Sequence, residues 1–231
     1  MIDLTVGTLA LLVGWGTLVG LDLVSVPQGL LARPLVAASV AGWLLGDTET
    51  GLRVGALLEL FALDVLPVGA SRYPEYGPAA IGATFLAVGL PSASGLGVGV
   101  VWGLVVALVA GYSLEWLRHT NARQVHRWSA ELDAGSTAVV RRLQWSGLAR
   151  DAARSAVISG LAIALAFAIG VSGQSAFLGL QAPITPVLVG VGVASALSGA
   201  LRTAGRGPRL AWLGVGVGLG ILAVFSFGVG S

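Results

Sequence analysis

Long apolar blocks separated by short polar joints run through almost the whole chain. The blocks cover residues 4–21, 35–45, 52–66, 79–90, 95–116, 155–171, 186–201 and 210–229. A helix needs about 20 apolar residues to cross the hydrocarbon core of a bilayer, and several of the blocks reach that length. The pattern predicts an all-α polytopic membrane protein, built as a helical bundle.

The apolar blocks of the N-terminal half are interrupted. After the first block the apolar sequence is interrupted by Pro27, Arg33 and Pro34, and block 35–45 is short for a full span. Proline removes a backbone hydrogen-bond donor that lipid cannot replace, so such a break must be buried in protein or line a polar cavity. We therefore expect broken or re-entrant helices in this half. Later, Gly95, Gly99 and Gly103 recur every four residues, which predicts a smooth helix face for close packing.

Charge divides the chain into three parts. We expect N-terminal membrane segments over 1–117, an Arg-rich linker over 118–154 and C-terminal membrane segments over 155–231. The linker holds seven of the 13 arginines and both histidines. A second cluster, at 202–209, is separated from the linker by two predicted spans. The positive-inside rule then places both clusters in the cytoplasm and the C-terminus on the outer side.

The amino-acid composition of the chain excludes several kinds of catalytic and metal site. Hydrophobic residues make up 55% of the chain and charged residues only 10%. All basic residues are Arg and there is no Cys, which excludes lysine-based mechanisms, thiolate nucleophiles and cysteine metal sites. Two histidines give little basis for a metal centre, so we expect no metal and no cofactor. The net charge of only +2, with the arginines clustered, indicates membrane topology rather than nucleic-acid binding.

Glu59 lies near the middle of the apolar block 52–66. A carboxylate at mid-depth is costly and is tolerated where it faces a cavity, a partner or an ion. The favoured interpretation is a role in binding a solute or a coupling ion; the alternative is a paired acid that holds two helices together. Asp64 follows five positions later, about 140° further round a helix, so the two acids do not form a catalytic pair.

Polar and glycine positions at fixed spacing give a more specific signal over about residues 26–85. They are Pro27-Gln28, Pro34-Leu35-Val36, Gly46-Asp47, Thr50-Gly51-Leu52, Gly55, Leu58-Glu59-Leu60, Gly69 and Pro74-Glu75. This series resembles the membrane subunit IIC of the mannose/fructose/sorbose family of sugar phosphotransferase systems (PTS). The chain departs from that pattern at three acids, with Glu59 for the usual Gln, Asp64 for Gly and Glu75 for Asp, and it lacks the double glycine before the Pro-acid pair.

The resemblance implies a bacterial inner-membrane subunit that binds and translocates a hexose-type sugar. A phosphorylated IIB subunit, supplied by IIA, would phosphorylate the sugar, and a IID membrane subunit would complete a unit that forms a homo-oligomer. The chain itself has no nucleophile with a base for phosphoryl transfer. The substrate-binding residues that the resemblance suggests are Gln28, Asp47, Thr50, Glu59 and Glu75.

Each of these residues also has an ordinary interpretation. Gln28 could satisfy freed backbone groups, Asp47 and Thr50 could cap a helix, and Glu75 could lie on a solvated loop. His119 and His126 lie in the Arg-rich linker and are interpreted as surface residues. Two other functions stay open: an ion-coupled secondary carrier that uses Glu59, and a non-transporting membrane scaffold.

Overall fold

The computed structural model describes residues 5–26, 28–65, 71–90, 92–177 and 181–204, and all regular structure in these ranges is helical. The helices are α1 (Val6–Val24), α2 (Pro34–Leu44), α3 (Thr48–Ala62), α4 (Tyr76–Gly89), α5 (Ser92–Arg127), α6 (Ser129–Asp133), α7 (Thr137–Phe177) and α8 (Gln181–Ala204). The predicted all-α class is confirmed. The predicted span 210–229 and most of the arginine cluster at 202–209 lie outside the described residues.

Four of the described helices are long and apolar enough to cross a membrane. These candidate spans are Val6–Val24, Gly95–Arg127, Thr137–Val171 and Ile184–Leu201. By contrast, α2, α3 and α4 have 11, 15 and 14 residues. At 1.5 Å per residue they reach roughly 16–23 Å, short of the ~30 Å hydrocarbon core. The prediction of broken helices in the N-terminal half is confirmed.

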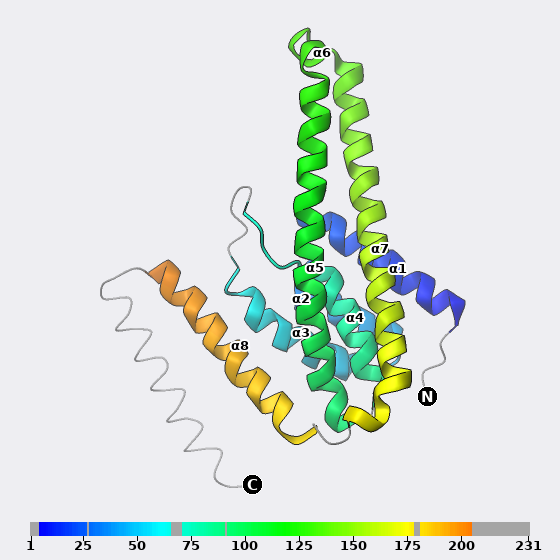
Figure 1. Ribbon diagram of the computed structural model, residues 1–231, viewed down its shortest axis with the longest axis vertical. Helices are drawn as coiled ribbons and strands as arrows, with labels where there is room; N and C mark the ends of the chain where they lie inside the picture. The colour runs from blue at the N-terminus through cyan, green and yellow to red at the C-terminus, as the bar shows by residue number, and fades with distance from the viewer. Residues whose placement is uncertain (1–4, 27, 66–70, 91, 178–180, 205–231) are drawn as a thin grey trace.

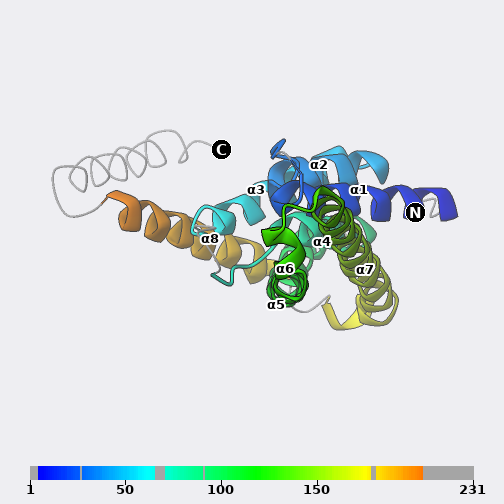
Figure 2. The same cartoon turned by 90° about the horizontal axis from the view of Figure 1, so that it is seen from above.

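Helix α4 forms the centre of the bundle. Every residue from Gly77 to Ala87 is buried, because α4 packs against α2, α5 and α7. Figures 1 and 2 show it enclosed by these helices. Its sequence is apolar on all sides, as expected for a helix without a solvated face. Pro78 falls in the first turn, where a missing backbone N–H costs nothing.

Glycines bring α5 close to α4. A Cβ atom on Gly95 would lie 2.3 Å from the Ala87 carbonyl oxygen, and one on Gly99 would lie 2.6 Å from that of Ala83. Only a residue without a side chain fits at these distances. The glycine face predicted from the four-residue spacing is therefore a packing face between these two helices.

Helices α5 and α7 extend far beyond the apolar blocks that predicted them. They have 36 and 41 residues, which correspond to about 54 and 62 Å. Figure 1 shows them continuing side by side away from the bundle to α6. The Arg-rich stretch 118–154 is thus a helical hairpin made of the end of α5, α6 and the start of α7. Gly135, with a φ of +76°, makes the turn before α7.

Candidate functional site

The chain breaks after α1, and Asp22 holds the break in place. Asp22 is buried, and its two carboxylate oxygens accept hydrogen bonds from the backbone N–H groups of Gly29 (2.5 Å) and Ala32 (3.0 Å). Leu30 between them has a φ of +64°, a conformation that needs such support in a branched residue. Asp22 therefore supplies the acceptors that irregular backbone requires inside a membrane bundle.

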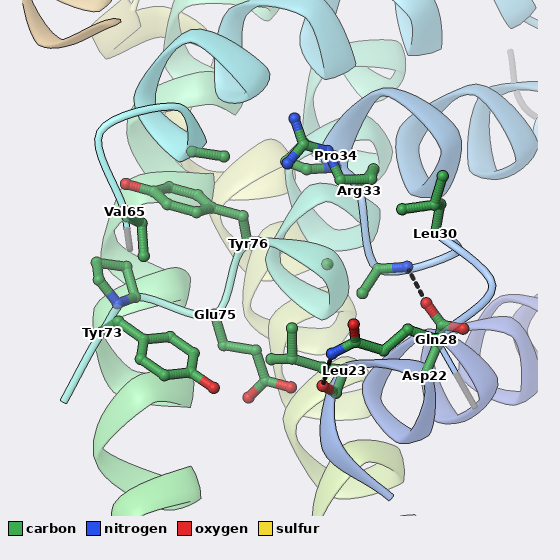
Figure 3. Close-up of a pocket in the computed structure, with 14 residues that line it drawn as sticks. Asp22, Leu23, Gln28, Leu30, Arg33, Pro34, Val65, Tyr73, Glu75 and Tyr76 are labelled. Atoms are coloured by element: carbon green, nitrogen blue, oxygen red, sulfur yellow. Dashed lines mark hydrogen bonds between the residues drawn. The ribbon is translucent and has the colours of Figure 1, made fainter. Parts of the chain in front are cut away.

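A cavity of about 210 Å³ opens beside this break. Its walls come from the end of α1, the segment before α2, the end of α3 and the loop that leads into α4. Its lining residues are Asp22, Leu23, Gln28, Leu30, Ala32, Arg33, Pro34, Ala62, Val65, Tyr73, Pro74, Glu75, Tyr76 and Gly77. Figure 3 shows Gln28 and Glu75 toward one end of the cavity and Arg33 and Tyr76 toward the other.

Gln28 lies on the broken segment and is exposed. Its side-chain Nε2 donates a hydrogen bond to the Leu23 carbonyl oxygen at 3.1 Å. That carbonyl belongs to the last turn of α1, where helix carbonyls have no partner within the helix. The side-chain oxygen of Gln28 accepts no hydrogen bond from the described residues, so it is available to a ligand.

Glu75 lines the cavity, yet its carboxylate is engaged by Arg154 on α7. Arg154 Nη1 and Nη2 donate to the two Glu75 oxygens at 2.6 and 3.0 Å, a bidentate pair. Arg154 also donates to Asp151 Oδ1 through Nε (3.0 Å) and Nη2 (2.9 Å). The side chains of Glu75 and Asp151 are 0% exposed and that of Arg154 is 5% exposed. Glu75 is thus part of a buried charge network rather than a residue of a solvated loop.

This network joins four separate parts of the chain. The Ser25 hydroxyl, at the end of α1, donates to Asp151 Oδ2. Arg154 Nη1 donates to Ser113 Oγ on α5 at 3.0 Å. The backbone N–H of Glu75 donates to the Ala107 carbonyl oxygen of α5 at 2.9 Å. The cavity wall formed by the loop before α4 is therefore fixed by α1, α5 and α7 together.

Glu59 stands behind the cavity rather than in it. Its carboxylate forms an ion pair with Arg33, which does line the cavity, and accepts a hydrogen bond from the Leu35 backbone N–H at 3.2 Å. The residue that precedes α2, Arg33, gives that helix no side-chain cap. Glu59 on α3 supplies the missing acceptor, and its negative charge lies at the positive end of the α2 dipole.

Asp47 and Thr50 lie at a different place. Asp47 caps α3, accepting hydrogen bonds from the Thr50 backbone N–H (3.0 Å) and hydroxyl (2.6 Å). The hydrogen bonds from Thr50 lower the pKa of the Asp47 carboxyl below its usual range. Both residues line a second cavity of about 210 Å³ with Arg53 and Leu96, and that cavity shares no lining residue with the first.

Of the five residues suggested by sequence, the structure brings Gln28 and Glu75 to one cavity, with Glu59 next to it through Arg33. Sequence reasoning missed Asp22, Asp151 and Arg154. The last two fell in the Arg-rich stretch assigned to the linker. Asp151, Arg154 and Ser155 share one helix face by their spacing, and all three are buried. An acidic, a basic and a small residue on one helix face is the pattern in the sequence that could have indicated this buried network.

Comparison with known proteins identifies relatives. The family model of the sorbose-specific IIC component of the PTS matches residues 6–172. The fructose permease IIC component of Bacillus subtilis is 32% identical over 153 residues, which cover 66% of this chain and 54% of that protein. The chain spans about half the length of the curated relatives it matches.

Two solved structures share the fold. One, described as a membrane protein, superposes with a TM-score of 0.73 at 20% identity, covering 97% of this chain and 94% of the other. The second is the cryo-EM structure of the mannose transporter ManYZ in complex with microcin E492. It superposes with a TM-score of 0.62 at 22% identity, covering 98% of this chain and 88% of the other.

Proposed function

Since the chain belongs to the family of the sorbose-specific IIC component of the PTS, we propose that it binds a hexose-type sugar and translocates it across the bacterial inner membrane. The observation that carries this proposal is the cavity at the broken segment after α1. Irregular backbone between short helices is where membrane transporters place their substrates. A volume of about 210 Å³ suits one small solute.

The groups around this cavity match the needs of a sugar. Sugar hydroxyls are both donors and acceptors, so a site requires both kinds of partner. Gln28 offers its amide oxygen, Tyr76 its phenol and Arg33 its guanidinium. Glu59 forms an ion pair with Arg33, and Arg154 forms one with Glu75. Glu59 and Arg154 therefore act as positioning residues for the two side chains that line the cavity. Asp47 and Thr50, proposed from the family pattern, would act at the second cavity as part of the sugar path.

In this proposal the chain itself would not catalyse the phosphorylation of the sugar. A phosphorylated IIB subunit, supplied by IIA, would modify the sugar, and a IID membrane subunit would complete the complex. Likeness to the mannose transporter ManYZ supports such an assembly. Positive charge at 118–154 and 202–209 supports a cytoplasmic position for both stretches. The hairpin would then face the soluble subunits.

The deciding experiment measures initial uptake of labelled fructose, mannose and sorbose in cells that supply IIA, IIB and IID. Gln28→Leu keeps the size but removes both hydrogen-bonding groups, and we expect uptake to fall roughly tenfold or more, because unpaired polar groups remain in the site. Gln144→Leu, an exposed position on the hairpin, is the matched control and should transport normally. Equal uptake by both variants at equal membrane level contradicts the site.

The ion-coupled carrier is the competing function. The ion pair between Glu59 and Arg33 argues against it, because a carboxylate already neutralised by an arginine is a poor site for a cation. Uptake that stops when the membrane potential and proton gradient are dissipated, while IIB phosphorylation continues, would favour that carrier. A chain that binds no sugar with or without its partner would favour a scaffold.

A further inference from the structure

A small cavity lies between α5 and α7 on the hairpin, and three arginines converge on it. It has a volume of about 190 Å³. Its lining residues are Gln124, Arg127, Trp128, Arg142, Leu143, Ser146 and Arg150. None of them is acidic. Figure 1 shows this part of the hairpin beyond the bundle, between the bundle and α6.

Neutral groups hold two of the three guanidinium groups in place. Arg150 Nε donates to the Asn121 side-chain oxygen at 2.9 Å, and Arg150 Nη2 donates to Ser146 Oγ at 3.3 Å. The Arg142 guanidinium lies over the Trp128 ring, 5.0 Å from its centroid. These contacts orient the arginines and leave their charges uncompensated.

Among the residues whose side chains the structure describes, four arginines pair with an acid and six do not. Arg33, Arg53, Arg72 and Arg154 each pair with a carboxylate. Within the residues that the structure describes, Arg127, Arg142 and Arg150 form no ion pair. Three like charges around one cavity repel one another, and a bound anion relieves that repulsion.

We propose that this cavity binds a phosphate group. Arginine's planar fork matches phosphate oxygens with paired hydrogen bonds. Gln124 adds a neutral donor, and Trp128 closes one wall. A phosphate offers tetrahedral oxygens to donors arriving from several sides, which suits three arginines better than a planar carboxylate does. Two sources share this chemistry, a soluble phosphate compound and a lipid headgroup.

The test measures binding of radiolabelled inorganic phosphate to the purified full chain in lipid nanodiscs by equilibrium dialysis. We expect saturable binding, competed by sulfate and not by chloride. Arg142→Gln and Arg150→Gln should each weaken it about tenfold, because each removes charge-assisted hydrogen bonds. Arg141→Gln is the matched control, since Arg141 is the exposed neighbour of Arg142 and does not line the cavity. If Arg150→Gln fails to fold, Arg142→Gln decides alone.

Nanodisc composition separates the two sources. Binding that is equal in zwitterionic and anionic nanodiscs assigns the site to a soluble phosphate. Binding that anionic lipid abolishes, with Arg142→Gln still lowering it in zwitterionic lipid, assigns the site to a headgroup. Absence of saturable binding in both lipids overturns the proposal, as does equal weakening by Arg141→Gln and Arg142→Gln. Because no sugar is present, the outcome is independent of the transport function.

Discussion

Arg154 is the side chain on which most of the buried polar contacts depend. It forms ion pairs with both Glu75 and Asp151 and also donates to Ser113 and Ser155. Burying an ion network costs desolvation free energy. Removing one partner destabilises the protein strongly, because the charge that remains is still desolvated but has lost its counter-ion. Arg154 therefore stabilises the cavity loop and α7 as one unit.

Replacing Arg154 should accordingly destabilise the protein strongly. Arg154→Met leaves two buried carboxylates without a cation, a loss of about 3–5 kcal/mol. That corresponds to a melting temperature lower by roughly 6–20 °C for a chain of this size. Arg154→Lys keeps the charge but not the bidentate geometry and should fall between. Thermal unfolding of the purified protein, with the exposed Arg141→Met as control, measures this. A melting temperature for Arg154→Met like that of the control would contradict the network.

Two substitutions of Glu59 distinguish whether transport requires its negative charge or only its hydrogen-bond acceptor. Glu59→Gln keeps an oxygen for the Leu35 N–H and loses only a partly exposed ion pair, worth about 0–1 kcal/mol. Glu59→Leu loses the acceptor too, at about 0.5–2 kcal/mol for a lost cap. We expect Gln to retain substantial sugar uptake and near-normal stability, and Leu to lose both. Equal loss of uptake in the two variants, with a normal amount of protein in the membrane, would instead support an ion-binding role for Glu59.

At the scale of helices, small residues set how closely the elements pack. On α1, a Cβ atom at Gly16 would lie 2.1 Å from Ser159 Oγ, and one at Gly20 would lie equally close to Ser155 Oγ. Both serines are on α7 and are buried. Glycines four apart on α1 thus face serines four apart on α7, an arrangement that lets two membrane helices touch along their backbones.

A pair of identical substitutions on α1 tests this contact. Gly16→Val should force α1 away from α7 and lower thermal stability, since overpacking costs about 1–3 kcal/mol. Gly14→Val is the control, because a Cβ atom at Gly14 has no neighbour within 4 Å. The change in helix propensity is the same in both, so a difference in melting temperature reports the contact. Equal melting temperatures would refute close packing at Gly16.

Sequence patterns predicted the elements better than their joints. Apolar block length located α1, α5 and α7 because spanning a bilayer imposes a length, and paired prolines located the break before α2. The apolar blocks did not show that α5 and α7 continue as helices through the polar stretch. An apolar block marks only the part of a helix that contacts lipid, and both helices extend beyond that part. They also could not show that Arg154 meets Glu75, because that pairing joins residues 79 positions apart and depends on how α7 packs against the loop.

At the scale of the whole molecule, the hairpin at 118–154 sets the orientation. Helices α5 and α7 are longer than the hydrocarbon core, so their paired ends project on one side of the membrane. Those ends, at 118–150, hold six of the chain's 13 arginines, and the seventh of the Arg-rich stretch, Arg154, lies in the buried network. Lys and Arg are retained on the cytoplasmic side of bacterial inner membranes, and the hairpin should therefore project into the cytoplasm.

Cysteine labelling tests this orientation without background, since the chain has no native cysteine. Ser136→Cys sits in the turn between α6 and α7, at the tip of the hairpin. It should be shielded from an impermeant thiol reagent added to intact cells and should react once the membrane is opened. Gly89→Cys is the matched control, because Gly89 is exposed and lies just before α5, at the end of that helix opposite the hairpin. It should react from outside. Labelling of Ser136→Cys and protection of Gly89→Cys in intact cells would invert the topology. The hairpin could then no longer meet the soluble subunits.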